Sequence, residues 1–329
     1  MGRQTFVIRI EEDLARKVSQ LLASRARGYS SLDELVHVAL QNQLGIEEAE
    51  EALPPESATR AIDQIAGSAL LMPSEKEPPL NLAHPQAPSS DRLFVLTNRL
   101  SPIKVAVRVL ARLGAEGEWP ALEDFQEKAA KIARHVGLEL RKEDLASRKR
   151  GQARRWVAYP IGDDERAAYS RFVTSFTMQV NDGKVLGPMI ILGLGNVKEG
   201  RAALTEAGWR LATAPSPTLD GAEGLTFSME EAAILRRQVL DAPGEREAVR
   251  EFLQIVKRAA GSQLRIDELL AARYPDWTET LTVAHRSALI GRLSDLDVVE
   301  VTGRGPNAKL RLLAHAEEFW ESTNGQGVA

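Results

Sequence analysis

Residues 3–10 read Arg3-Gln4-Thr5-Phe6-Val7-Ile8-Arg9-Ile10, and the organisation of the whole chain starts from them. Apolar side chains occupy every second position from Phe6 to Ile10, and the side chains between them point the other way. This period of two is typical of a strand with one buried face. The opposite, outward set is Thr5, Val7 and Arg9.

Directly after this strand the period of the apolar residues changes to that of a helix. Leu14, Val18 and Leu21 recur at helical spacing, and residues 25–29 interrupt the pattern. Ser30-Ser31-Leu32-Asp33 then predicts the start of a second helix, because Ser30 can cap free amides and Asp33 places a carboxylate in the positive first turn. Residues 1–45 therefore predict one strand followed by two helices.

A strand and two helices of this length cannot bury their apolar faces alone. The strand would be an open edge, and a domain of roughly 40 residues has a marginal core. Pairing with a second copy solves both problems, because two strands join as an antiparallel ribbon and four helices close beneath it. Residues 1–45 thus predict a homodimer.

The strand Thr5–Ile10, with Leu14 and Val18, residues 28–31 and residues 34–40, resembles the ribbon-helix-helix family of DNA-binding repressors. In that family the outward side chains of the ribbon enter the major groove, which a two-stranded ribbon fits. The resemblance implies that Thr5, Val7 and Arg9 face the groove and that Ser30 and Ser31 hold a backbone phosphate. A strand and helices used only for dimerisation are the alternative.

Composition limits the remaining interpretations. The chain has 329 residues, a net charge of −4 and no cysteine. This length predicts two or three domains, and the net charge means that contact with nucleic acid must come from local basic patches. The absence of cysteine excludes disulfides and thiolate metal sites and fits a cytoplasmic location. The most apolar run, Val185–Leu194, is too short to span a bilayer, so we expect no membrane contact.

Residues 46–92 predict a flexible, acidic, proline-rich linker. They contain seven of the sixteen prolines and nine acidic against three basic residues, with no aromatic residue. Folded sequence follows, in two modules at 93–214 and 225–322. The expected fold class is therefore mainly α with small β elements, α+β, with two winged-helix-like modules after the ribbon-helix-helix domain.

The first module, 93–214, predicts helices from Ser101-Pro102 and after Trp119-Pro120, the second closing at Gly137. Phe172–Val180 alternates and predicts a strand, Asn181-Asp182-Gly183 a hairpin turn, and an apolar strand follows to Leu192. Gly193–Gly200 is expected to be a loop before a helix at Leu204–Leu211. Helices, a hairpin and a closing helix resemble a winged-helix domain.

The second module, 225–322, opens on the capping box Ser228-Met229-Glu230-Glu231. Three further helices are expected at Glu247–Ala260, Ile266–Tyr274 and Leu281–Leu296, followed by a hairpin of strands around Val298–Val301 and Lys309–Leu313. This order again resembles a winged helix. The resemblance implies that Leu281–Leu296 enters the groove and that the hairpin is the wing. The implied DNA contacts are Thr282, His285, Arg286, Arg304, Lys309 and Arg311.

The densest positive charge lies between Arg141 and Arg155, with seven basic residues against two acidic ones. On an acidic protein this stripe would release counterions when laid along phosphates, and the following Trp156 could add stacking. A solvated helix face is the alternative. The residues of the stripe that we assign to DNA are Arg148, Lys149, Arg150, Arg154 and Arg155.

Enzymatic patterns are weak. Gly193–Gly200 has the wrong glycine spacing for a dinucleotide loop and lacks the lysine of a P-loop. Asp163 or Asp164 with Asp182 has roughly the spacing of a metal-dependent nuclease, but a hairpin turn already explains Asp182. The five histidines are scattered. We therefore expect no catalytic residues, no metal and no cofactor.

The sequence as a whole favours a non-enzymatic, dimeric transcriptional regulator that binds double-stranded DNA. The alternative is an adaptor or scaffold subunit, or a replication or partition factor, whose winged helices bind a protein partner. The operator sequence and any effector are not readable from these patterns.

Overall fold

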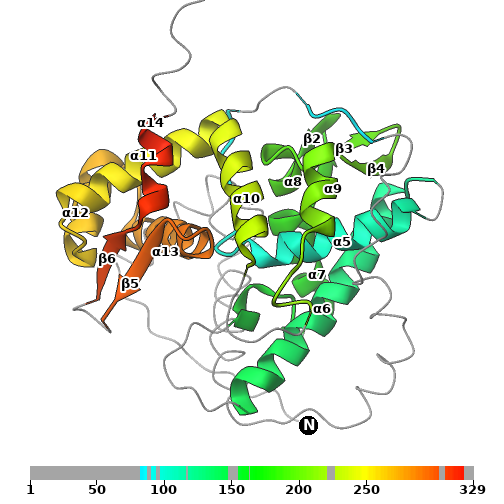
Figure 1. Cartoon of the computed structure of the whole chain (residues 1–329), viewed down its shortest axis with the longest axis horizontal. Coiled ribbons are helices and arrows are strands. Elements are labelled where there is room, and N and C mark those ends of the chain that lie inside the picture. The colour runs from blue at the N-terminus through cyan, green and yellow to red at the C-terminus, as the bar shows by residue number, and fades with distance from the viewer. Residues whose placement is uncertain are drawn as a thin grey trace, which may run out of the picture. The chain divides into compact units, whose positions relative to one another are not determined.

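The computed structural model describes residues 82–86, 90–93, 97–115, 118–146, 155–162, 164–220, 227–303 and 308–321. All of them belong to one compact unit, Thr59–Ala329. They are mainly helical with small antiparallel two-stranded sheets, which confirms the predicted α+β class (Figure 1). The predicted strand and helices of residues 1–45 lie outside the described residues, and so do residues 46–81 of the predicted linker.

The N-terminal half of the described chain, Ser101–Asp220, is built around a buried helix. Its elements are α5 (Ser101–Ala115), α6 (Leu122–Ala146), η2 (Arg155–Ala158), α7 (Glu165–Phe176), β1 (Gln179–Asn181), β2 (Lys184–Leu186), α8 (Pro188–Ile191), β3 (Gly195–Lys198), β4 (Arg201–Leu204) and α9 (Glu206–Thr213). Nearly every residue of α5 is buried, because α6, α7 and α9 pack against it. The predicted start of α5 at Ser101 is confirmed.

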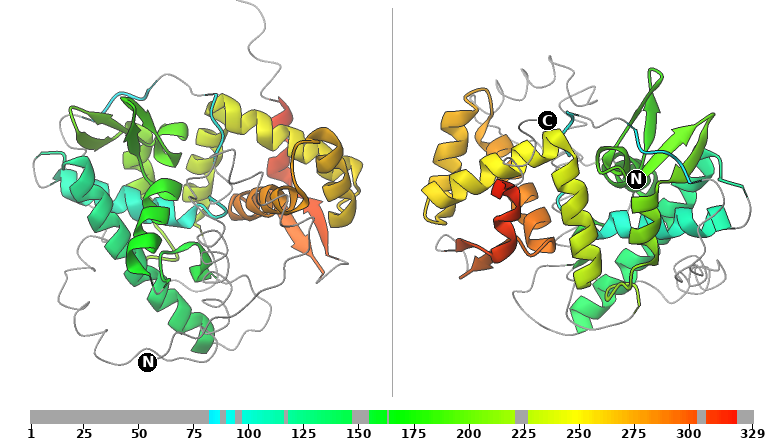
Figure 2. Two further views of the ribbon diagram at one scale, coloured as in Figure 1. Left: turned by 180° about the vertical axis from the view of Figure 1, so that it is seen from behind. Right: turned by 45° about the horizontal axis from the view of Figure 1, so that its top comes forward.

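Helix α6, the long blue-green helix of Figure 2, does not end at Gly137 as predicted but continues to Ala146. The glycine serves packing rather than termination. A Cβ atom at Gly137 would lie 2.5 Å from Tyr159 Cβ and 2.6 Å from Ile161 Cγ2. The absent side chain thus lets the segment after η2 lie directly on the helix.

The strand predicted for Phe172–Val180 is wrong for most of its length, since α7 runs to Phe176. Phe172 and Phe176 are four residues apart and so share one face of a helix, where their rings lie 5.6 Å apart. Asp164 caps the helix by accepting from Ala167 N at 2.9 Å. The alternation of two phenylalanines with polar residues fits both periods, and burial against α5 favours the helix.

The turn at Asn181-Asp182-Gly183 is confirmed. Asp182 and Gly183 have φ of 48° and 74°, and Asn181 pairs with Lys184 across β1–β2, as a two-residue hairpin requires. The apolar strand expected to reach Leu192 stops at Leu186, and α8 follows it. Gly193–Gly200, expected to be a loop, contains β3 and the tight turn into β4.

The rest of the described chain is mostly helical. Its elements are α10 (Met229–Asp241), α11 (Pro243–Arg258), α12 (Gln263–Arg273), α13 (Glu279–Asp295), β5 (Val299–Thr302), β6 (Lys309–Leu312), η4 (Ala314–Ala316) and α14 (Glu318–Glu321). The capping box predicted at Ser228 is confirmed: Ser228 Oγ accepts from Glu231 N, and Ser228 N donates to Glu231 Oε2. We call residues 243–321 the C-terminal half, and α10 connects it to the N-terminal half.

Each half contains a hairpin whose second strand also pairs with the chain just before a helix. In the N-terminal half Arg201 of β4 pairs with Ala121, directly before α6. In the C-terminal half Lys309 of β6 pairs with Ser262, directly before α12. The predicted order of three helices and a hairpin in residues 243–312 is confirmed, and the return pairing holds the hairpin against the turn between α11 and α12.

Candidate nucleic-acid interface

Many of the residues assigned to DNA from the sequence lie outside the described residues. They are Thr5, Val7, Arg9, Ser30, Ser31, Arg148, Lys149, Arg150, Arg154 and Arg304. Arg155 begins η2. The next residue, Trp156, is buried, with the Arg141 guanidinium 5.7 Å from its ring centroid. Its indole is therefore a core side chain and does not present a stacking face to a base.

The three residues predicted on α13 differ in accessibility. Thr282 is only 2% exposed, and its hydroxyl donates to Thr278 O at 3.1 Å, so we leave it out of the interface. His285 stacks on Trp277 with ring centroids 4.0 Å apart. Arg286 forms an ion pair with Asp267 of α12. Burial raises the pKa of Asp267, although Arg286 beside it acts in the opposite direction.

The aromatic stack at the turn between α12 and α13 continues through Tyr274, whose ring lies 4.0 Å from that of Trp277. Tyr274 donates to Glu251, and Arg273 pairs with the same carboxylate at 2.5 Å. Burial would raise the pKa of Glu251, but these two hydrogen bonds outweigh it and the pKa is lowered. This cluster neutralises its own charges and fixes the turn before α13.

Both predicted residues of β6 are exposed. Arg311 pairs across the hairpin with Glu300 at 2.5 Å. Lys309 lies opposite Ser262, at the end of the turn that joins α11 to α12. This turn is tight: Gly261 has φ of 75°, its carbonyl accepts from Leu310 N at 2.9 Å, and an added Cβ would lie 2.2 Å from Leu310 O. The close approach requires glycine here.

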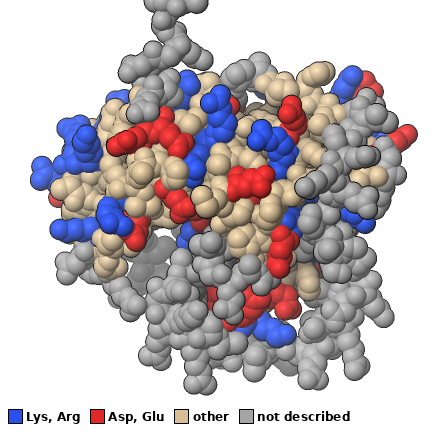
Figure 3. All heavy atoms as spheres, viewed as in Figure 1, with Lys and Arg blue, Asp and Glu red and all other residues tan. Residues whose placement is uncertain are grey.

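Three basic residues that sequence reasoning missed surround this turn together with Lys309. Lys257 and Arg258 end α11, and Arg265 lies in the first turn of α12. All four side chains are exposed, and within the part of the chain that the structure describes none forms an ion pair. We call Lys257, Arg258, Arg265 and Lys309 the cation cluster. Figure 3 shows Lys and Arg gathered at the edge of the view where α12 and the β5–β6 hairpin lie.

The electrostatics around the cation cluster favour an anion. The N-terminus of α12, an 11-residue helix, adds the positive end of its dipole and its first free amides. Lys257 also lies over Trp320, with Nζ 5.5 Å from the ring centroid. Charge counts along the sequence could not have distinguished these residues from Arg273, Arg286 or Arg311, because only the fold shows which bases have acidic neighbours.

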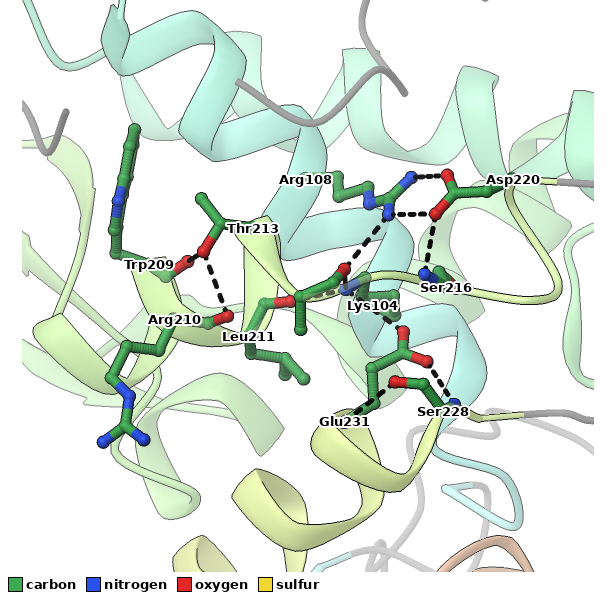
Figure 4. A network of polar contacts seen from close by, with 11 residues as sticks. Lys104, Arg108, Trp209, Arg210, Leu211, Thr213, Ser216, Asp220, Ser228 and Glu231 are labelled. Carbon is green, nitrogen blue, oxygen red and sulfur yellow. Dashed lines mark hydrogen bonds and ion pairs between the residues drawn. The ribbon is translucent and has the colours of Figure 1, made fainter. Parts of the chain in front are cut away.

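The most buried basic side chains of the N-terminal half are not available to a ligand, because they are bound within the protein (Figure 4). Lys104 Nζ donates to the carbonyls of Leu211 at 2.5 Å and Ala214 at 2.7 Å and lies 3.1 Å from Glu231 Oε1. Burial lowers the pKa of Lys104 to about 8, although Glu231 acts in the opposite direction. One turn on, Arg108 forms a bidentate pair with Asp220 at 2.5 and 2.9 Å. These cations tie α5 to the end of α9 and to α10.

Two of the candidate nuclease carboxylates have structural roles: Asp164 caps α7 and Asp182 forms the β1–β2 turn, while Asp163 lies outside the described residues. Among the described residues no three His, Asp or Glu side chains gather closely enough to hold a metal ion. No helix in the described ranges is both long and apolar enough to cross a bilayer. Comparison with protein-family models, curated proteins and solved structures finds no match to the chain.

Proposed function

We propose that the chain is a DNA-binding protein without catalytic activity that regulates transcription as a dimer. The observation that carries this proposal is the cation cluster, four exposed basic side chains around the N-terminus of α12 that form no ion pair among the described residues. Such an arrangement gains free energy by releasing counterions from a phosphate backbone. Because the chain as a whole has a net charge of −4, a local group of basic side chains with no ion pair in the described ranges is the feature to explain.

The order of elements in the C-terminal half supports a winged-helix mode of binding. Helices α11, α12 and α13 precede the β5–β6 hairpin, and β6 pairs back to Ser262. In the winged-helix family the third helix enters the major groove and the hairpin contacts the backbone. In that mode the cation cluster would hold phosphates, while the exposed side chains near the start of α13, Thr280 and Val283, would face base edges.

The ribbon proposed for residues 1–45 would supply a second contact. Thr5, Val7 and Arg9 from two chains would read a short palindromic site, and a tether through residues 46–81 would raise the local concentration of the C-terminal contact. Bivalent binding of this kind explains why one chain carries two separate candidate interfaces.

The test measures the affinity of the full chain for a fluorescent duplex that the protein itself has selected from random DNA, across a range of salt concentrations. In the variant with Lys257, Arg258, Arg265 and Lys309 replaced by glutamine, we expect the slope of log affinity against log salt to become shallower by about 3 to 4, at roughly 0.9 per phosphate contact. Arg9→Ala should weaken binding separately, through the ribbon.

A matched control removes the same number of positive charges, but from arginines that form ion pairs with acidic residues. Arg201, Arg237, Arg273 and Arg311 are all exposed and paired, with Glu118, Asp241, Glu251 and Glu300 respectively. Replacing these four by glutamine should change the salt slope little. Equal slopes in wild type and cation-cluster variant, or equal losses in both variants, would refute the proposal.

An adaptor role is the second candidate, and exposed apolar side chains favour it. Leu264 of α12, Val283 of α13 and Val301 of β5 are exposed, while Arg286 and Arg311 are already paired. Under this alternative Leu264→Glu would abolish co-purification with a protein partner. The full chain would then show no salt-dependent affinity for DNA, and Arg9→Ala would have no effect.

A further inference from the structure

The N-terminal part of helix α13 presents a face to solvent that carries methyl groups and hydroxyls but no exposed basic side chain. Thr280 and Val283 are three residues apart, and Ser287 follows one turn further on, so all three lie on the same side of the helix. All three are exposed, and the apolar side chain of Val283 is open to solvent at 37% exposure. This is the face that the proposed winged-helix mode turns toward base edges.

The two arginines of α13 are bound within the protein. Arg286 forms its ion pair with Asp267 of α12, and Arg292 is buried and pairs with Glu245 of α11 at 2.8 Å. The helix contains no lysine, asparagine or glutamine. Arginine, lysine, asparagine and glutamine are the side chains that bind guanine or adenine through two hydrogen bonds. None of these four residue types therefore stands on the exposed face of α13.

His285, also in the first two turns of α13, belongs to a column of stacked rings. It stacks on Trp277 with the ring planes at 10°, and Trp277 stacks on Tyr274 with the planes at 9°. The Arg273 guanidinium lies 5.6 Å from the centroid of the Tyr274 ring. The column holds the start of α13 against the turn before it, because a shift of the helix would break these ring contacts. The exposed face is thus presented from a rigid support, as contact with a group as small as a methyl requires.

We infer that α13 reads the C5-methyl groups of thymine, so that the ligand of this face is duplex DNA with A·T pairs at the contacted positions. The inference rests on the proposed function, since it assigns a base to the helix that this function places in the major groove. Thymine is the base whose major-groove edge carries a methyl group. Its contact with Val283 or with the methyl group of Thr280 removes apolar surface of both partners from water. The polar edges of guanine and adenine offer no such surface.

Glu279, exposed in the first turn of α13, adds a second preference on the same face. It lies four residues before Val283 and therefore on the same side of the helix. A carboxylate only accepts hydrogen bonds, so it can accept from the amino group of adenine or cytosine but repels the acceptor atoms O6 and N7 of guanine. The carboxylate and the methyl groups thus both disfavour guanine at the positions that α13 contacts.

The test removes one methyl group at a time from the DNA. In the fluorescent duplex that the full chain selects from random DNA, each thymine in turn is replaced by uracil on deoxyribose, which lacks only the methyl group. We expect affinity to fall about fourfold at one or more positions, the effect of leaving one methyl-sized group out of the contact. Val283→Ala and Thr280→Ser, which keeps the hydroxyl, each remove methyl groups from the protein. In at least one of these variants the thymine and uracil duplexes should bind equally at such a position.

Val180→Ala is the matched control, because Val180 of β1 is also an exposed valine but lies in the N-terminal half. It should keep the difference between the two duplexes. Equal affinities at every position in the wild type would overturn the inference, and so would a difference that persists in both Val283→Ala and Thr280→Ser. In either case the salt slope and its dependence on the cation cluster would be unchanged, and the proposed function would stand. A chain that binds no duplex at any salt concentration would overturn both.

Discussion

The two halves of the described chain share a plan and both bury basic side chains, Lys104 and Arg108 in one and Arg292 in the other, but the C-terminal half also gathers exposed basic side chains beside its hairpin. Each has a hairpin whose second strand pairs with the residue before a helix, Ala121 in one half and Ser262 in the other. The N-terminal half buries Lys104 and Arg108 at its centre and satisfies them with carbonyls and carboxylates. In the C-terminal half the cation cluster is exposed and forms no ion pair with any residue that the structure describes. The same residue types thus serve cohesion where they are buried and remain available to a ligand where they are exposed.

The largest effect should come from removing one partner of the buried charges in the N-terminal half. Glu231→Ala takes the carboxylate from the buried Lys104 and the capping bond from Ser228. Breaking a buried ion pair from one side typically costs about 3–5 kcal/mol, because a charge stays buried without its partner. We expect the free energy of unfolding in urea, followed by circular dichroism, to fall by about that amount.

Glu230→Ala is the matched control, since Glu230 is exposed in the same first turn of α10. It should change the free energy of unfolding by less than about 0.5 kcal/mol. Similar losses in Glu230→Ala and Glu231→Ala would show that the loss does not come from the pair with the buried Lys104.

The features that could be predicted from the sequence are those fixed within a few residues. The turn at Asp182-Gly183 needs positive φ, and the capping box at Ser228 is completed three residues later. Both have the same form in any fold. The limit of local prediction is seen at 172–176, where a strand is expected and the structure has the end of α7. Phe172 and Phe176 fit the period of a strand or of a helix, and packing against α5 selects the helix.

The candidate interface was predictable only in part, for a tertiary reason. Lys309 was assigned from its place in the expected wing, and the expected hairpin is present. Arg286 was assigned on the same reasoning, yet it pairs with Asp267, 19 residues earlier in the chain. Lys257, Arg258 and Arg265 carried no local signal, since only the fold shows that they form no ion pair among the described residues. The turn at Gly261, which is hydrogen-bonded to Leu310 of β6, brings these three residues together.

An intermediate effect on the free energy of unfolding is expected from pH. It arises from the buried Lys104, which the exposed lysines of the cation cluster do not resemble. Burial lowers its pKa to about 8 in the folded chain, below the ordinary value of 10.5. Between these two pH values the unfolded chain binds more protons than the folded one, so the free energy of unfolding rises with pH. The gain should approach about 1.4 kcal/mol per pH unit inside the window.

The measurement is urea unfolding at pH 8, 9 and 10 for the wild type and Lys104→Met. The difference between the two proteins isolates the lysine, because the other titrating groups are common to both. We expect the wild type to gain stability relative to Lys104→Met across this range. A constant difference, or one that moves the other way, would mean that the buried amine keeps an ordinary pKa.

The smallest effect should be found at the paired charges on the surface of the C-terminal half. Arg311 and Glu300 lie opposite each other on β6 and β5, with side chains 65% and 46% exposed. An exposed pair contributes about 0.2–1 kcal/mol, because water screens the attraction and two long side chains must be ordered. A double-mutant cycle with Arg311→Ala and Glu300→Ala should therefore give a coupling of at most about 1 kcal/mol, and weaker still at high salt. A coupling as large as the loss in Glu231→Ala would mean that an exposed pair stabilises this half as strongly as a buried one, and the cation cluster would no longer stand apart from the paired basic residues around it.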